Sequence, residues 1–112
     1  GTVAMMRNMA GMMKKVEEMK KRMEALQSEM EQASFAASVG GDVVTVSVTG
    51  KGFVQSVSIN PEAVDPAEID VLEDMICLAT NKAKQKAETE MAARIKDITG
   101  GLPLPPGMNL PF

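Results

Sequence analysis

The sequence predicts an α+β fold: a long helix, a three-stranded antiparallel sheet and a second long helix, in the order α-β-β-β-α. Three observations predict it. Apolar residues recur at helical spacing in the first part of the chain, β-branched residues alternate with polar ones in the middle, and helical spacing returns after a proline-marked turn. At 112 residues the chain has the length of one small domain.

The first segment, from Met5 to Gln32, contains no proline and one glycine. Its apolar residues follow one another in alternating steps of three and four, which is the heptad spacing of a coiled coil and predicts a long helix with one apolar seam. The seam consists of Met9, Met12, Val16, Met19, Met23, Leu26 and Met30. Three uses of the seam remain open: an ordinary core, a contact between two copies of the chain, and a methionine-lined groove for an apolar partner.

The middle of the chain is typical of strands joined by glycine-containing turns. The predicted strands are Phe35 to Val39, Val43 to Thr49 and Phe53 to Ile59. Strict alternation places the valines of the second strand on one face. In the third strand it places Phe53, Gln55, Val57 and Ile59 together on one face. A sheet this small does not bury itself, so it and the apolar seam together predict a homodimer.

A second helix is predicted to start at Asp65, with Pro66 in the first turn and Glu68 completing a capping box. It carries one apolar face made of Ile69, Leu72, Ile76, Ala79, Ala83, Ala87, Met91, Ile95 and Ile98. Gly100 and Gly101 are expected to end this helix. The last segment, residues 102–112, holds four prolines and is expected to be an extended tail.

Composition excludes several classes of site. The chain has no His, one Cys, no Trp and no Tyr, which removes imidazole-based catalysis, cysteine-based zinc clusters and most aromatic stacking on single-stranded nucleic acid. We find no catalytic constellation, no metal ligands and no cofactor motif, and expect a protein that is not an enzyme. Cys77 lies among apolar residues and is expected to be buried. No apolar run approaches the roughly 20 residues that span a bilayer.

Charge is unevenly distributed along the chain, although the net charge is only −3. Residues 1–22 carry six basic and two acidic side chains, residues 23–81 one basic and ten acidic, and residues 82–96 five basic and two acidic. Basic blocks on helices that extend away from the sheet can neutralise phosphates, and their other interpretation is a solvated face. The candidate DNA-binding residues are Lys14, Lys15, Lys20, Lys21, Arg22, Lys82, Lys84, Lys86, Arg94 and Lys96.

Four segments resemble the YbaB/EbfC family of bacterial nucleoid-associated proteins. They are the opening helix with Met12-Met13-Lys14-Lys15 and Met19-Lys20-Lys21-Arg22-Met23, the hairpin from Val46-Ser47-Val48-Thr49-Gly50 to Val57-Ser58-Ile59-Asn60-Pro61, the helix from Leu72-Glu73-Asp74 to Ala79-Thr80-Asn81-Lys82-Ala83, and the tail Leu104-Pro105-Pro106-Gly107-Met108-Asn109-Leu110-Pro111-Phe112. The resemblance covers residues 5–112.

The resemblance implies a tweezer-like homodimer whose long helices project from a sheet-based centre. It also implies binding of double-stranded DNA with little sequence preference, an influence on nucleoid organisation and gene expression, and a place in the cytoplasm at the nucleoid. The domain is then expected at residues 5–101, with residues 1–4 a cloning remnant or an upstream extension. A plastid branch of the family is linked to protein targeting. The alternative function is therefore a protein-interaction module, in which the Met-rich helix and the Pro/Phe tail engage a nascent chain, a ribosome-associated factor or a targeting factor.

Overall fold

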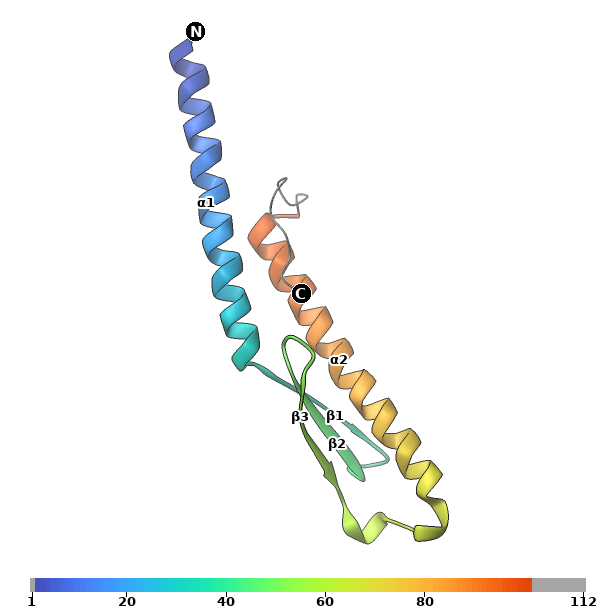
Figure 1. The fold of residues 1–112 in the computed structure, drawn as a ribbon. Helices are drawn as coiled ribbons and strands as arrows, with labels where there is room; N and C mark the ends of the chain where they lie inside the picture. The colour runs from blue at the N-terminus through green and yellow to red at the C-terminus, as the bar shows by residue number, and fades with distance from the viewer. Residues whose placement is uncertain (1, 102–112) are drawn as a thin grey trace.

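A three-stranded sheet lies between two long helices in chain order; α2 runs along the sheet and α1 extends away from it (Figure 1), which confirms the predicted α-β-β-β-α order. The structure, a computed structural model, describes residues 2–101. Its helices and strands are α1 (Thr2–Gln32), β1 (Ser34–Val39), β2 (Val44–Thr49), β3 (Val54–Ile59) and α2 (Ile69–Thr99). Two short 3-10 turns, Pro61–Ala63 and Pro66–Glu68, connect β3 to α2.

The sheet packs one face against α2. Its strands are antiparallel in the order β1-β2-β3. The central strand alternates as predicted, because its valines are buried and the polar residues between them face the other way. Alanines of α2 meet the valines, and their short side chains let the helix approach the sheet closely. The buried residues of this core are Ala37, Val44, Val46, Val48, Ala79, Ala83 and Ala87.

Strand β3 departs from the predicted alternation at one residue. The register between β2 and β3 shifts next to Ser47, so that Gln55 is an extra residue in β3. The amide oxygen of Gln55 accepts hydrogen bonds from Ser47 Oγ at 3.1 Å and from Ser34 Oγ at 2.9 Å, on the polar face of the sheet. The prediction that Gln55 shares a face with Val57 and Ile59 is therefore wrong, because the bulge interrupts the strict period of two.

The two helices run antiparallel and pack against each other from the sheet to the end of α2. The second core cluster lies between them and consists of buried Leu26, Met30 and Met91, with partly buried Met23, Ile95 and Ile98 packed against it. This contact confirms that the last three residues of the predicted seam, Met23, Leu26 and Met30, belong to the core. It also confirms the apolar face predicted for the second half of α2.

One glycine lets α1 close onto the β2–β3 turn. The backbone N–H of Gly50 donates to the carbonyl of Met30 at 2.8 Å. A Cβ added at Gly50 would lie 2.6 Å from Met30 Cβ and 2.7 Å from Met30 O, closer than atoms tolerate. Glycine is therefore required at position 50, because the backbone of the β2–β3 turn approaches that of α1 closely here.

The ends of α2 follow the predicted signals with one correction. The Asp65 carboxylate accepts from the N–H of Ala67 at 2.9 Å, as an N-cap does, but it caps the 3-10 turn rather than α2. The helix proper begins after Glu68, whose side chain makes no capping hydrogen bond, so the predicted capping box does not form. At the other end Gly100 adopts the left-handed conformation, with φ of 65°, and ends α2 as predicted.

The N-terminal half of α1 extends past the end of α2 (Figure 1), and the described chain measures 78 Å along its longest axis. The seam continues along this half, where no other element among residues 2–101 packs against it. Met9 and Met12 are 62% and 68% exposed, and Val16 is 39% exposed. The predicted seam is thus covered near the sheet and uncovered beyond α2. The proline-rich tail predicted at residues 102–112 lies outside the described residues.

Candidate nucleic-acid interface

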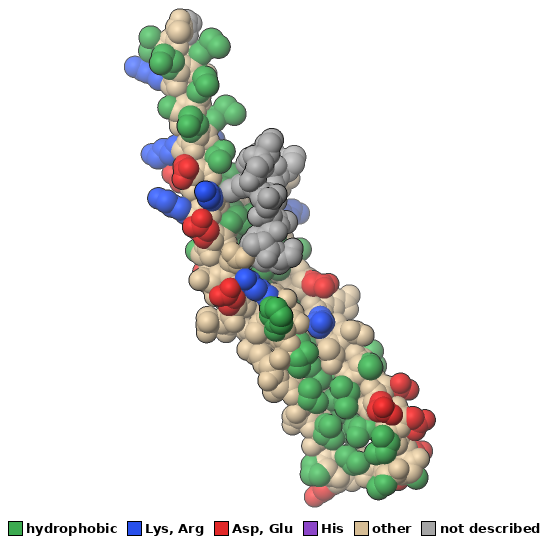
Figure 2. All heavy atoms as spheres, in the orientation of Figure 1, with side chains coloured by type: hydrophobic (Ala, Val, Ile, Leu, Met, Phe, Trp, Pro, Cys, Tyr) green, Lys and Arg blue, Asp and Glu red, His purple; other side chains and the backbone are tan. Residues whose placement is uncertain are grey.

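The first basic block lies in the middle of α1: Lys14 and Lys15 belong to the half that extends past α2, whereas Arg22 lies level with the last turns of α2. All five predicted residues are exposed: Lys14, Lys15, Lys20, Lys21 and Arg22. Figure 2 shows the basic side chains mostly along the left side of the upper part of α1, and apolar side chains along its right side and around its tip. The projecting half of α1 is therefore amphipathic, with a methionine face and a basic face.

Three basic residues form a single line on the basic face. Arg7, Lys14 and Lys21 follow one another at intervals of seven residues, which returns them to nearly the same side of an α-helix. The line lies on the side of the helix opposite to Met12 and Val16 and extends over about 21 Å at 1.5 Å per residue. We call these three residues the outer stripe. The sequence prediction left out Arg7, although the seven-residue interval was the signal that could have found it.

Only part of the second basic block lies where the sequence predicted. It was expected at the distal end of a helix leaving the sheet, but Ala83 and Ala87 pack against the sheet, so Lys82, Lys84 and Lys86 lie beside the sheet. The prediction is wrong for these three residues because α2 crosses the sheet for about half its length before it reaches α1. Arg94 and Lys96 do lie in the part of α2 beyond the sheet.

Two residues of the second block already bind protein groups. Lys86 Nζ donates to the carbonyl of Ala36 on the outer edge of β1 at 2.8 Å. The Arg94 guanidinium pairs with Glu29 across the two helices and lies 3.9 Å from Glu90. These contacts engage Lys86, which is nonetheless exposed, and the half-buried Arg94; Lys82, Lys84 and Lys96 are also exposed.

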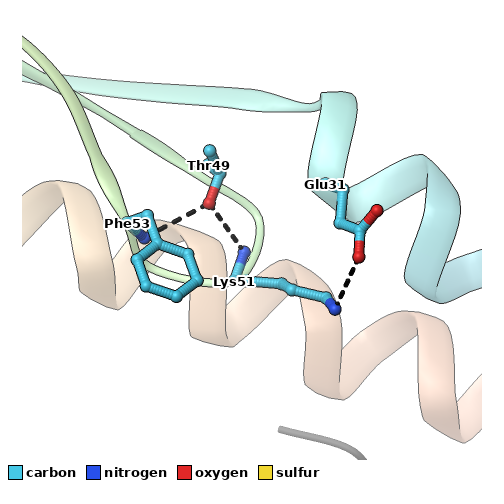
Figure 3. Close-up of polar contacts among 4 residues, drawn as sticks. All are labelled: Glu31, Thr49, Lys51 and Phe53. Atoms are coloured by element: carbon cyan, nitrogen blue, oxygen red, sulfur yellow. Dashed lines mark hydrogen bonds and ion pairs between the residues drawn. The ribbon is translucent and has the colours of Figure 1, made fainter.

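Lys51, in the β2–β3 turn, is also engaged within the protein. Its ammonium lies 2.8 Å from a Glu31 carboxylate oxygen, and its side chain is 18% exposed (Figure 3). The turn is organised by the Thr49 hydroxyl, which accepts from the N–H groups of Lys51 and Phe53, each at 3.2 Å. Lys51 therefore points at α1 rather than into solvent.

The opposite end of the molecule is acidic. Residues 62–74 carry six acidic side chains and no basic one. They form the turns before α2 and its first residues, at the far end from the start of α1 (Figure 1), and acidic side chains gather there in Figure 2. Positive and negative charge are thus separated along the length of the molecule.

Other kinds of site find no support in the described part of the chain. Among residues 2–101 there is no group of three or more His, Cys, Asp or Glu side chains that could hold a metal ion. None of the helices described here is long and apolar enough to cross a membrane. Cys77 is exposed, which corrects the prediction that it is buried.

Comparison with known proteins agrees with this architecture. Residues 5–102 match the profile of the YbaB/EbfC DNA-binding family. A nucleoid-associated protein of Granulibacter bethesdensis is 44% identical over 107 residues, covering 96% of this chain and all of that protein, and one of Brucella ovis is equally similar. The crystal structure of an uncharacterized Helicobacter pylori protein shares the fold, with a TM-score of 0.68 at 18% identity over 82% of this chain and 94% of that one. The chain belongs to the YbaB/EbfC DNA-binding family.

Proposed function

We propose that this protein is a nucleoid-associated protein that binds double-stranded DNA as a homodimer, in the cytoplasm at the nucleoid. The observation that carries the proposal is the outer stripe: three exposed basic side chains in line on α1, whose N-terminal half extends past the end of α2. The family's description and the names of the relatives supply the class of ligand.

The chemistry of the stripe favours binding to the DNA backbone. Duplex DNA presents one phosphate charge per roughly 1.7 Å of axis, so a stripe about 21 Å long can meet several phosphates at once. Lys and Arg contacts to phosphate fix position but read no bases. Binding through this stripe is therefore weakly selective for sequence, and an effect on nucleoid organisation and gene expression would follow from occupancy along the DNA.

The free edge of the sheet favours a dimer through β3. This strand is exposed along its length, and its apolar side chains Val54 and Val57 are 49% and 45% exposed. On the other edge, β1, the Lys86 ammonium already occupies one backbone carbonyl, that of Ala36, which makes this edge less suited to pairing. Pairing of two β3 edges would join the sheets of two subunits and cover these valines. The projecting α1 helices would then extend from a common centre.

A titration of duplex DNA at several salt concentrations tests the DNA-binding function, with sedimentation of the free protein to test the dimer. We expect binding that weakens steeply with salt and is similar for unrelated duplexes of equal length. Binding that is absent at low salt would refute the DNA-binding function. A folded monomer at micromolar concentration would refute the dimer independently.

A further inference from the structure

The apolar seam of α1 is covered along only part of its length. Near the sheet, Met23, Leu26 and Met30 pack against α2. Beyond this contact the same seam continues, yet Met9 and Met12 are more than half exposed. The change occurs where α2 ends at Thr99, because no described element follows α1 further. An exposed row of large apolar side chains in line with a buried one indicates that another segment or molecule packs on the exposed part.

The chain itself continues from this point. Gly100 and Gly101 end α2 beside α1, next to a groove of about 260 Å³ between the helices. The lining of this groove is mostly charged, with Ala25, Leu26 and Ile98 as its apolar residues, so the uncharged surface open to the tail is the seam beyond it. The next eleven residues, 102–112, have no charged side chain and contain three leucines, a methionine and a phenylalanine between four prolines. Their composition matches the seam, which is equally apolar and uncharged.

The tail also has the length to reach the whole uncovered seam. A proline-rich segment spans about 3.1 Å per residue, so eleven residues reach about 34 Å. The seam from Met23 to Met9 spans fourteen residues of helix, which is about 21 Å. Prolines reduce the number of conformations that the free tail samples, and this lowers the entropy cost of docking. Methionines adapt their shape to an irregular partner such as this one.

We propose that residues 102–112 lie along Met9, Met12 and Val16 of the same chain and extend the cover that α2 provides. Attachment to the end of α2 gives the tail an effective concentration that a separate partner lacks. The outer stripe lies on the opposite side of α1, so the docked tail leaves the basic face free. The packed tail would stabilise the projecting half of α1, which otherwise is a single helix without tertiary contacts among residues 2–101.

Tryptophan fluorescence tests the proposal directly, because the chain contains no Trp or Tyr. The variant Phe112→Trp places one fluorophore at the end of the tail. We expect its emission to shift toward shorter wavelength relative to a free tail peptide with the same substitution, and quenching by acrylamide to fall severalfold. Emission identical to that of the free peptide would overturn the proposal.

A matched pair of seam variants locates the docking site. In the Phe112→Trp background, Met9→Gln, Met12→Gln and Val16→Gln together should abolish the shift while circular dichroism shows that α1 remains helical. Met6→Gln with Met13→Gln is the control, because these two exposed methionines lie beside the seam. A shift that survives the seam substitutions, or one lost equally in the control, would overturn the proposal.

A mixing experiment separates the same chain from a second copy. The Phe112→Trp chain is equilibrated with an excess of the seam-substituted chain that lacks the reporter. A shift that is unchanged in the mixture supports docking within one chain. Loss of the shift would mean that the tail covers the seam of another subunit. A shift that appears only after another protein is added would mean that the seam binds a separate partner. Either result overturns the proposal.

Discussion

The outer stripe makes a quantitative prediction for DNA binding. Replacing Arg7, Lys14 and Lys21 by Gln removes three charges but keeps good helix formers at exposed positions, so the fold should be unaffected. If each side chain neutralises one phosphate, every stripe that contacts DNA loses three contacts. Each contact contributes about 0.9 to the slope of log K against log salt, so the slope should fall by about 2.7 per stripe.

That change in slope corresponds to a large change in affinity. The counterion contribution vanishes at 1 M salt, so the variant and the unchanged protein bind equally there. At 0.1 M salt a slope change of 2.7 makes the dissociation constant of the variant about 500-fold higher than that of the unchanged protein. The assay is fluorescence anisotropy with a labelled duplex at four or more salt concentrations. Two unrelated duplexes should lose affinity by the same factor, because phosphate contacts carry no sequence information.

A charge-matched control separates the stripe from net charge. Lys51, Lys86 and Arg94 are also three basic residues, but each is engaged by a protein group: Glu31, the Ala36 carbonyl and Glu29 respectively. Replacing these three by Gln should change the slope by less than one unit, provided that circular dichroism shows an unchanged fold. If the control flattens the salt dependence as much as the stripe variant does, the stripe is not the DNA-binding surface and the reasoning fails.

Three further predictions concern packing and assembly. Gly50→Ala should lower the free energy of unfolding by about 1–3 kcal/mol in urea titrations, because its Cβ would overlap Met30; an unchanged midpoint would contradict this close approach. Gly11→Ala meets nothing within 4 Å on an exposed helix, so amide exchange in the projecting half of α1 should slow by roughly fivefold, about 1 kcal/mol, and faster exchange would count against a helix there. Val57→Lys should shift sedimentation toward the monomer because it places a charge on the apolar side of β3, whereas Ser58→Lys on the polar side should not; equal behaviour of the two would exclude this face from the interface.

The order of elements could be predicted from the sequence because each one has its own local signal. Heptad spacing in α1, β-branched alternation in β2 and glycines at the end of α2 depend on residues close together in the chain. The boundaries at Asp65 and Glu68 were harder, since the same capping residues begin a 3-10 turn as well as a helix. The bulge at Gln55 could not be predicted, because it depends on which residues of β2 lie opposite.

The candidate site was predictable in part for a related reason. Exposure of the α1 block follows from its amphipathic pattern, and the structure places all five of those residues on the surface. The engagement of Lys86 and Arg94 depends on contacts with Ala36 and Glu29, which lie fifty or more residues away in the chain. Long-range contacts of this kind decide which charges are free, and composition alone does not contain them.

The acidic balance of the whole chain does not argue against DNA binding by one end of it. The sequence pI is about 4.9, but this value reflects the total charge and not where the charges lie on the molecule. Charges screen one another beyond about 8 Å at physiological ionic strength, whereas the described molecule is 78 Å long. The outer stripe and the acidic residues 62–74 lie at opposite ends, so a phosphate near the stripe is affected by the stripe and hardly at all by the distant carboxylates. If the acidic end approaches the duplex, its carboxylates are repelled by the phosphates. This favours an orientation in which α1 meets the DNA and the sheet points away from it.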